Sequence, residues 1–450
     1  MDVVVSFGCL SLLLLAGKLL RVRSGLFQRL YLPASVIGGV LGLVLIQLLG
    51  SRLPAVCTAG WSRLPGLLIN VVFAALFLGI TIPPLATIWR RSGPQLAYGQ
   101  IVAWGQYIVG LAVVVVILGP LLGTSPLFGV IVPVGFEGGH GTAGGLAESF
   151  RQLGWSEGTD YGLASATVGI VSAIVIGMAL INWAVRRGIL EHVQPMSSLP
   201  EAERAGLYPE GRRPVAGRQP VVADSVDSLA LQLAIVGLAV LIGFGLKQAL
   251  IGIETAVTGS DGPPILRAFP LFPLCMIGGL LVQLLTDRTM ENSPIDRGLM
   301  QRLGGLALDF LVVAAISTIR LSVVAEGLLP FAVIVAGGIL WNVFCILWLA
   351  RRLLPNYWFE RAIAEMGQSM GVTATGLLLL RVVDPKSESD APSAFGYKQL
   401  LHEPFMGGGL WTSTAVLLVA TRGAGLALAI SIGAVLFWLV VWALVLRPRG

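Results

Sequence analysis

A glycine-rich stretch at residues 135–145 places ionisable side chains among residues that break helices. It reads Gly-Phe-Glu-Gly-Gly-His-Gly-Thr-Ala-Gly-Gly, so it contains Glu137, His140 and Thr142. Each glycine costs a helix about 1 kcal/mol relative to alanine, so a regular helix is disfavoured. An interrupted helix exposes amides, which attract carboxylates, and carbonyls, which coordinate sodium. The structural alternative is close helix packing, which small residues also allow.

A second stretch, residues 367–376, carries neutral oxygen donors between glycines. It reads Gly-Gln-Ser-Met-Gly-Val-Thr-Ala-Thr-Gly. Unwound backbone in a membrane transporter can coordinate a sodium ion, and amide and hydroxyl oxygens are donors of the same kind. We therefore expect this stretch to be the flexible polar counterpart of residues 135–145.

Hydroxyl side chains also occur in the apolar segments that follow these two stretches. Ser165 and Thr167 lie after the first stretch, and residues 412–414 (Thr-Ser-Thr) lie after the second. Each hydroxyl could face a binding site, or it could bond back to a carbonyl oxygen of the preceding turn. His140 likewise could bind a substrate or donate to a neighbouring carbonyl.

Two charged residues, Asp309 and Arg320, are expected in one apolar span, eleven residues apart. That spacing is about three helical turns, so both side chains would lie on one face. Arg320 could hold a substrate carboxylate. Alternatively, its side chain extends to the outer surface of the membrane.

These residues must be positioned by segments that suit a lipid bilayer. Of 450 residues, 55% are hydrophobic and 12% are charged, against about 25% charged residues in soluble domains. A span needs ~20 apolar residues. The first apolar segment has no basic head or cleavage site, which indicates a span rather than a removed signal. The sequence predicts an all-α polytopic membrane protein with spans at 3–20, 33–50, 66–88, 97–122, 162–185, 228–250, 268–286, 303–321, 325–350, 403–421 and 424–446.

Two further apolar stretches, 127–149 and 360–382, are predicted to be re-entrant hairpins. Basic residues mark the cytoplasmic side of a membrane protein. With these hairpins and the N-terminus outside, most of the 30 lysines and arginines, Lys398 among them, are cytoplasmic, as is the C-terminus. A full span at 127–149 would instead move Arg186 and Arg187 outside. The predicted location is the plasma (inner) membrane.

A short motif, P-x-x-x-x-G-G, recurs in the second span of each half, at 33–39 and at 273–279. Each half then has two more spans, a hairpin and a final span, and the odd number of spans inverts the second half. Inverted repeats with interrupted segments at matching positions are typical of secondary transporters. The predicted parts are a first repeat at 1–186, a cytoplasmic linker at 187–227, a second repeat at 228–422 and an extra transmembrane helix at 423–450.

Other protein classes lack their usual sequence signals here. The four cysteines share no short motif, which argues against a disulfide framework or a zinc site. The sequence contains neither a phosphate-binding loop nor a nucleophile motif, so we expect no enzyme, no ATP-driven pump and no cofactor. The net charge of +6 forms no basic stripe for nucleic acid. An ion channel is the competing class, and it would conduct without the coupling ion that a symporter requires.

At residues 33–39, 138–142 and 164–169, the chain resembles the bacterial sodium/glutamate symporter family. A looser second hairpin and Pro404-Phe-Met-Gly follow in the same order, so the resemblance covers most of residues 1–422. It implies sodium-coupled uptake of L-glutamate by a homodimer, with the two hairpins moving as a unit in an elevator-like cycle. Another small carboxylate or amino acid is the alternative substrate.

The chain departs from the family pattern in its second half. Gly-Gln-Ser-Met-Gly at 367–371 replaces a pattern with histidine and cysteine, and residues 412–414 stand where an acidic residue is expected. The span at 424–446 extends past the usual end of the family. These departures concern the ion-binding arm and the identity of the substrate.

The resulting hypothesis places sodium and substrate where the hairpin tips meet near the membrane midplane. Bound sodium would lower the free energy needed to bury the anion, which couples the two. The residues expected to bind substrate are Gly138, Gly139, His140, Gly141, Thr142, Thr167, Gln368, Ser369, Gly371 and Thr373. The residues expected to bind sodium, which is the one metal predicted, are Glu137, Ser165, Thr375, Thr412, Ser413 and Thr414.

Overall fold

The computed structural model describes residues 2–29, 32–80, 84–190, 207–208, 211, 213, 215–222, 224–258, 265–384 and 388–447. Within these ranges every regular element is a helix. Eight of the described helices are long and apolar enough to cross a membrane. The predicted all-α class of membrane protein is therefore confirmed. Much of the predicted linker at 187–227 lies outside the described residues.

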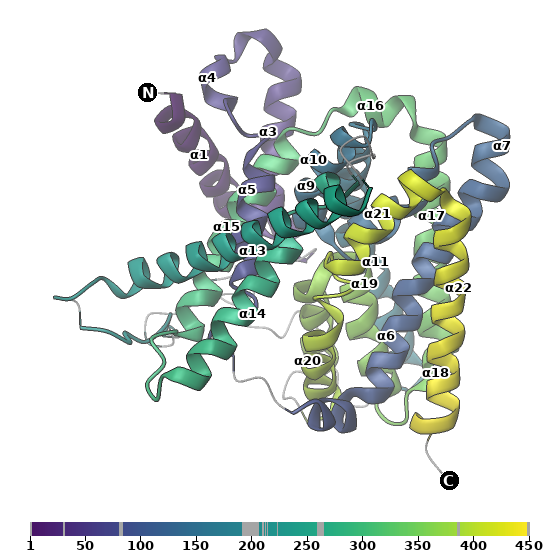
Figure 1. Ribbon diagram of the computed structural model, residues 1–450. Coiled ribbons are helices and arrows are strands. Elements are labelled where there is room, and N and C mark those ends of the chain that lie inside the picture. The colour runs from purple at the N-terminus through teal and green to yellow at the C-terminus, as the bar shows by residue number, and fades with distance from the viewer. Residues whose placement is uncertain are drawn as a thin grey trace.

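The first three spans of each half pack together into one group of helices, which we call bundle A (Figure 1). Its helices are α1 (Asp2–Arg23), α3 (Ala34–Leu49), α5 (Leu64–Ala74), α13 (Ser228–Thr258), α14 (Phe272–Thr289) and α15 (Arg297–Ser317). Buried side chains of α5, α13, α14 and α15 form one apolar core of bundle A. Those of α1 and α15 form a second.

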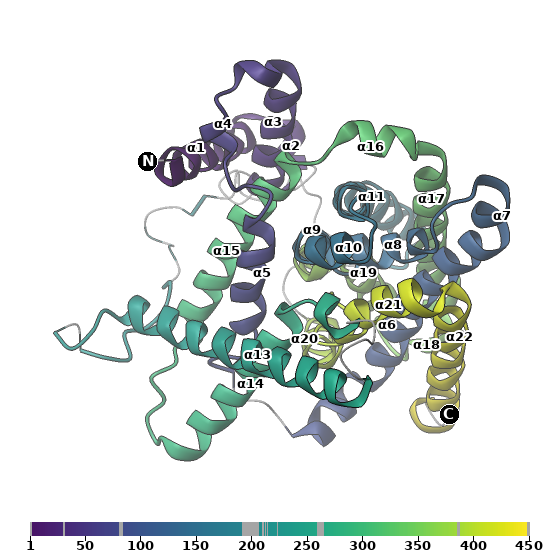
Figure 2. The same ribbon diagram turned by 45° about the horizontal axis from the view of Figure 1, so that its top comes forward.

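The later spans and the hairpins form bundle B, which lies beside bundle A in both views (Figure 2). Most of the largest apolar core lies in bundle B. Its long helices are α6 (Leu85–Val113), α11 (Gly158–Arg186), α17 (Leu328–Phe344), α19 (Trp358–Val383) and α22 (Ala424–Val441). Its shorter helices are α8 (Ile131–Phe136), α9 (Gly139–Gly145), α10 (Ala147–Gln152), α20 (Ala391–His402) and α21 (Leu410–Arg422).

The first glycine of the repeated P-x-x-x-x-G-G motif has the same packing in both halves. A β-carbon at Gly38 would lie 2.5 Å from the Leu13 carbonyl oxygen of α1. Gly278 lies in the same way against the Ala239 carbonyl oxygen of α13. In each half, this glycine lets the second span approach the backbone of the first span closely.

The second glycine of each motif contacts the opposite half. A β-carbon at Gly39 would lie 2.7 Å from Cβ of Ile316 in α15, and Gly279 packs against the Ala74 carbonyl oxygen of α5. The second span of each half therefore packs on the third span of the other half. This reciprocal contact joins the two halves within bundle A.

The fourth span of each half is a long helix with a π turn near its end. α6 continues through the π turn Val114–Leu118 into α7 (Gly119–Leu122). α17 continues through the π turn Cys345–Leu349 into α18 (Ala350–Leu353). π turns are rare and occur frequently at functional sites. The two halves thus share a local distortion as well as an order of elements.

The predicted single span at 66–88 is wrong. α5 ends at Ala74, and α6 begins at Leu85. The end of α5 is fixed by Arg297 from the second half, whose Nη1 donates hydrogen bonds to the carbonyl oxygens of Ala75, Leu76 and Leu78. A cation that binds the last carbonyls stabilises a helix C-terminus. The hydropathy pattern of residues 66–88 could not predict this break, because the break depends on a contact with a residue far away in the sequence.

The predicted span at 403–421 is wrong in its bounds. α21 begins at Leu410 and is preceded by α20, which ends at His402. Residues 403–409 between them are not helical, and Gly408 has φ +92°. α20 was not predicted from the sequence, because its polar residues interrupt the apolar pattern. The fifth span of the second half is therefore discontinuous.

Residues 127–149 fold into two short arms separated by a break. The inward arm consists of η3 (Pro126–Val130) and α8, and the returning arm consists of α9 and α10. The ring centroids of Phe128 and Trp155 lie 5.2 Å apart, so the segment starts and ends at the same place. Each arm is shorter than the ~20 residues of a full span.

Residues 358–383 are likewise interrupted, at Gly371 and Val372, whose dihedral angles are not helical. A β-carbon at Gly367 would lie 2.7 Å from Cα of Gly376, so the two arms run back along each other. Both arms are shorter than the ~20 residues that a span needs. Although the length of α19 would allow it to cross a membrane, its interruption makes it a folded-back segment.

Candidate functional site

The interruptions of the two folded-back segments contact each other inside bundle B. A β-carbon at Gly139 would lie 2.5 Å from Cγ1 of Val372. Both residues have positive φ, +66° for Gly139 and +64° for Val372. A positive φ is rare for a β-branched residue such as valine, and strained backbone often marks a functional site. We call this contact the tip junction.

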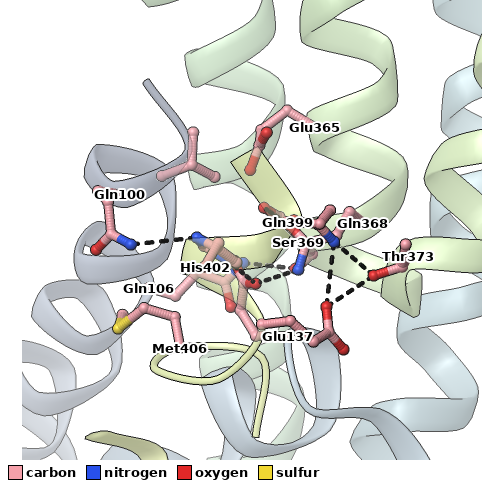
Figure 3. Close-up of polar contacts among 12 residues, drawn as sticks. Gln100, Gln106, Glu137, Glu365, Gln368, Ser369, Thr373, Gln399, His402 and Met406 are labelled. Atoms are coloured by element: carbon pink, nitrogen blue, oxygen red, sulfur yellow. Dashed lines mark hydrogen bonds and ion pairs between the residues drawn. The ribbon is translucent and has the colours of Figure 1, made fainter. Parts of the chain in front are cut away.

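Glu137 joins the tip junction to two other elements through one carboxylate oxygen (Figure 3). Its Oε2 accepts a hydrogen bond from Gln368 Nε2 over 2.7 Å, and His402 Nε2 lies 3.1 Å away. All three side chains are buried. One carboxylate thus connects the first folded-back segment, the second one and the end of α20.

The hydrogen bonds around His402 indicate a neutral imidazole. Trp104 Nε1 donates to Gln100 Oε1 over 3.0 Å, which turns the amide nitrogen of Gln100 toward His402. Gln100 Nε2 lies 3.3 Å from His402 Nδ1, which must accept, because an amide nitrogen only donates. Nε2 therefore carries the proton and donates it to Glu137. This assignment fixes one tautomer of His402.

A buried lysine lies next to this group. Lys398 Nζ donates to Glu365 Oε1 over 2.6 Å and to Gln368 Oε1 over 3.2 Å. Glu365 Oε2 accepts a further hydrogen bond from Gln95 Nε2, at 2.9 Å. The side chains of Lys398 and Glu365 are fully buried. Charges are rarely buried at membrane depth unless they are paired and functional.

Four buried oxygens of residues predicted to bind sodium or substrate have no hydrogen-bond partner in the part of the chain that the structure describes. They are Glu137 Oε1, Thr142 Oγ1, Ser165 Oγ and Ser413 Oγ. A buried polar atom without a partner costs about 1–3 kcal/mol. A bound cation would remove that cost, and such oxygens are suitable ligands for sodium.

A cavity of about 240 Å³ lies between the two bundles. Arg297, Leu76, Phe77 and Ile80 line it from the side of bundle A, and Thr373 and Glu403 line it from the side of bundle B. The Thr373 hydroxyl donates to Glu403 Oε2 over 2.8 Å. The cavity therefore has a guanidinium group on one wall and a carboxyl group on the other.

Comparison with known proteins identifies the family of the chain. A model of the sodium/glutamate symporter family matches residues 1–386. The chain belongs to the sodium/glutamate symporter family. Among curated proteins and solved structures, no match was found. Membership of this symporter family indicates a membrane transporter that couples glutamate transport to sodium.

The matched part of this symporter ends before α20 begins. Lys398, His402 and Glu403 therefore lie beyond the residues that the family model covers. The resemblance predicted from sequence was wider, since it included most of residues 1–422. The buried cation of the site is thus contributed by a part of the chain that the family match does not include.

Several residues predicted for the symporter's site do lie together. Glu137 and Gln368 bond directly. Ser369 is joined to α6, because its carbonyl oxygen accepts a hydrogen bond from Gln106 Nε2 over 2.6 Å. Thr373 lines the cavity between the bundles. These contacts bring both glycine-rich stretches to one place, although their roles in binding remain proposals.

Other predicted residues have local partners. His140 Nε2 lies 2.9 Å from Thr167 Oγ1, whose hydroxyl donates back to the Leu163 carbonyl oxygen. Thr414 is exposed and donates to the Leu410 carbonyl oxygen. The alternative of back-bonding therefore describes the geometry at both threonines.

The remaining predicted residues shape backbone at or near the junction. Thr412 donates to the Met406 carbonyl oxygen over 2.8 Å, and Thr375 donates to the carbonyl oxygen of Gly371. A β-carbon at Gly141 would lie 2.9 Å from Ile69, so this glycine faces bundle A. A β-carbon at Gly138 would lie 2.6 Å from Cβ of Thr142.

The buried partners from α6, α19 and α20 were not predicted from the sequence. Lys398 was counted among the basic residues that mark the cytoplasmic side, and its burial in the site was not predicted, whereas the structure places its side chain fully buried on α20. The spacing of Lys398 and His402 by one helical turn contained a usable signal, since it places both on one face of a helix. Glu365 and Gln368 have a similar spacing in the second folded-back segment.

The prediction for Arg320 is also corrected. α15 ends at Ser317, so Arg320 does not share a helix with Asp309. The Arg320 guanidinium forms an ion pair with Asp160 at the start of α11, with 2.8 Å between Nη2 and Oδ2. Arg320 therefore binds the carboxylate of Asp160, where the sequence had suggested that it could bind the carboxylate of a substrate.

Proposed function

We propose that this chain takes up L-glutamate together with sodium at the tip junction. The observation that carries the proposal is the buried bond between Glu137 and Gln368, which links two oppositely placed folded-back segments. α10 lies at the open end of the first folded-back segment, and α18 leads into the second folded-back segment. Figure 1 places α10 near one end of bundle B and α18 near the opposite end. This placement supports two inverted re-entrant hairpins.

Sodium is proposed to bind the buried oxygens that have no partner within the described residues. Glu137 Oε1, Thr142 Oγ1 and Ser165 Oγ come from the first hairpin and α11. Gly408 in the break before α21 lies against Thr142, so that break also borders the proposed ion site. Interrupted helices provide such oxygens near the midplane in other folds of secondary transporters.

Glutamate is proposed to bind in the cavity between the bundles. Arg297 offers hydrogen bonds to a carboxylate, and Glu403 offers a partner for an ammonium group. Thr373, which was predicted to bind substrate, lines this cavity beside Glu403 and donates a hydrogen bond to it. Amides at the hairpin tips would complete the site.

An elevator-like movement of bundle B against bundle A is supported by the surface between them. In α9, glycines face bundle A: Gly144 lies against Pro65, and Gly145 lies against Ile69 and Phe272. A surface without side chains allows two groups of helices to slide with few steric barriers. Movement of bundle B would carry the tip junction past Arg297.

The orientation is proposed from charge and from the ends of the chain. Figure 1 places the first turn of α1 and the last turn of α22 at opposite ends of the molecule. This supports an N-terminus outside and a C-terminus in the cytoplasm, in the plasma (inner) membrane. The homodimer implied by the resemblance is retained as a proposal, and the mass of the protein in native membrane discs would test it.

The substrate is tested by competition in proteoliposomes. Uptake of radiolabelled L-glutamate would be measured in sodium chloride and in choline chloride, against an excess of L-aspartate, D-glutamate or dicarboxylates without an amino group. We expect uptake in sodium alone and competition by L-glutamate above all others. Stronger competition by a dicarboxylate would replace glutamate as the substrate, and equal uptake in choline would contradict sodium coupling.

A further inference from the structure

We infer that Lys398 is a tethered cation, whose ammonium group takes a place that a coupling sodium ion would otherwise occupy. The place lies between the carboxylate of Glu365 and the amide oxygen of Gln368. The inference rests on the proposed function, because it concerns how many sodium ions the transport site needs. It assigns Lys398 a role in fixing the ratio of sodium to glutamate.

The surroundings of the ammonium group are those of a bound cation. Lys398 Nζ contacts two oxygens, Glu365 Oε1 at 2.6 Å and Gln368 Oε1 at 3.2 Å. α6 leaves room for this pair through Gly99, where a β-carbon would lie 2.5 Å from Glu365 Oε1 and 2.6 Å from Lys398 Cε. Three elements are therefore shaped around one buried positive charge.

The ammonium group is connected to the tip junction by a single side chain. Gln368 accepts from Lys398 through Oε1 and donates to Glu137 through Nε2, at 2.7 Å. The charge on Lys398 is therefore one amide away from the carboxylate proposed to bind sodium. A cation at this position affects the number of ions that the junction must bind.

Charge balance gives the expected effect of removing the lysine. Glu137, Glu365 and Lys398 are fully buried and His402 is neutral in its assigned tautomer, so the group carries one net negative charge. A neutral residue at position 398 would leave two buried carboxylates without a fixed cation. A buried charge without a partner is strongly unfavourable. A sodium ion is the available cation, and alanine leaves room for it.

The test compares Lys398→Ala with the double variant Glu365→Gln/Lys398→Met. The uptake of ²²Na⁺ and of radiolabelled glutamate would be measured in the same proteoliposomes. We expect Lys398→Ala to carry one more sodium ion per glutamate than the parent protein. The double variant removes both charges and fills the space, so its ratio should equal the parent ratio. An unchanged ratio in Lys398→Ala, or a raised ratio in the double variant, would overturn the inference.

A binding measurement keeps the inference separate from the proposed substrate. The melting temperature of each purified variant would be measured in sodium chloride and in choline chloride, without glutamate. We expect sodium to raise the melting temperature of Lys398→Ala by more than that of the parent and the double variant. Equal effects of sodium on all three proteins would refute the tethered cation. Absence of glutamate uptake by the parent protein would instead refute the proposed function alone.

Discussion

At the scale of single residues, the site depends on a carboxylate that is used asymmetrically. Glu137 Oε2 binds Gln368 and His402, whereas Oε1 has no hydrogen-bond partner among the described residues. The first oxygen holds three elements together. The second is available to a cation, so one side chain can connect ion binding to the packing of the tip junction.

Replacing Glu137 by glutamine tests the role of its negative charge while the shape of the side chain is nearly unchanged. Glutamine keeps an oxygen that accepts from Gln368, but it loses the negative charge. We expect the sodium concentration for half-maximal uptake to rise about tenfold or more, which corresponds to about 1.4 kcal/mol or more of lost binding free energy. Sodium titration of glutamate uptake in proteoliposomes would measure this change.

Glu148→Gln is the matched control for Glu137→Gln. Glu148 lies on α10 and pairs with Arg151, and both side chains are mostly exposed. An exposed ion pair contributes little to stability or binding. The control should keep the sodium dependence of the parent protein. If both variants respond alike, the proposed ion-binding role of Glu137 is wrong.

Gly99→Ala tests the space around the buried ion pair. Its β-carbon would overlap Glu365 and Lys398, and overpacking of this kind destabilises a protein by about 1–3 kcal/mol. Gly433→Ala in α22 is the control, because the described structure leaves its surroundings open. Thermal unfolding in detergent should show a lower midpoint for Gly99→Ala than for Gly433→Ala. Equal midpoints would mean that α6 is not shaped around the ion pair.

At the scale of elements, α9 forms the contact with bundle A across which the proposed movement of bundle B would take place. Gly141, Gly144 and Gly145 face α5, α14 and α15 without side chains of their own. The break itself lies beside them at Gly139, which has positive φ, so one glycine-rich stretch provides both the interruption and the surface between the bundles. Both functions predicted for the glycine-rich stretch, an interruption and close packing, are present in one segment.

Gly144→Val tests that surface. The new side chain would project against Pro65, where even a β-carbon would lie 2.6 Å from Cβ of the proline. We expect the initial rate of glutamate uptake to fall about tenfold, while the thermal stability of the protein changes less. Gly237→Val in α13, whose surroundings among the described residues are open, should keep the parent rate. A parent-like rate in Gly144→Val would contradict sliding at this surface.

The sequence predicted the elements whose signal is local. Glycine runs marked both interruptions, and the repeated P-x-x-x-x-G-G motif marked equivalent helices. The end of α5 was missed because it depends on Arg297 from the other half of the chain. The burial of Lys398 was missed because counting basic residues along a chain does not distinguish an exposed lysine from one that pairs with Glu365 in the folded protein.

At the scale of the whole molecule, each half of the chain is divided between the two bundles. Each half contributes its first three spans to bundle A and its later spans to bundle B. This arrangement leaves the tip junction in bundle B and Arg297 in bundle A, with a cavity between them. A relative movement of the bundles would then change the access to one site instead of opening a continuous pore.

In the proposed function, the sodium gradient drives glutamate through this site against the concentration gradient of glutamate. The measurement is glutamate content in proteoliposomes with equal glutamate on both sides, an inward sodium gradient and the membrane potential held at zero. We predict that internal glutamate rises above the external concentration and that reversal of the sodium gradient drives glutamate out. Glutamate that stays equal on both sides under either gradient would contradict the claim.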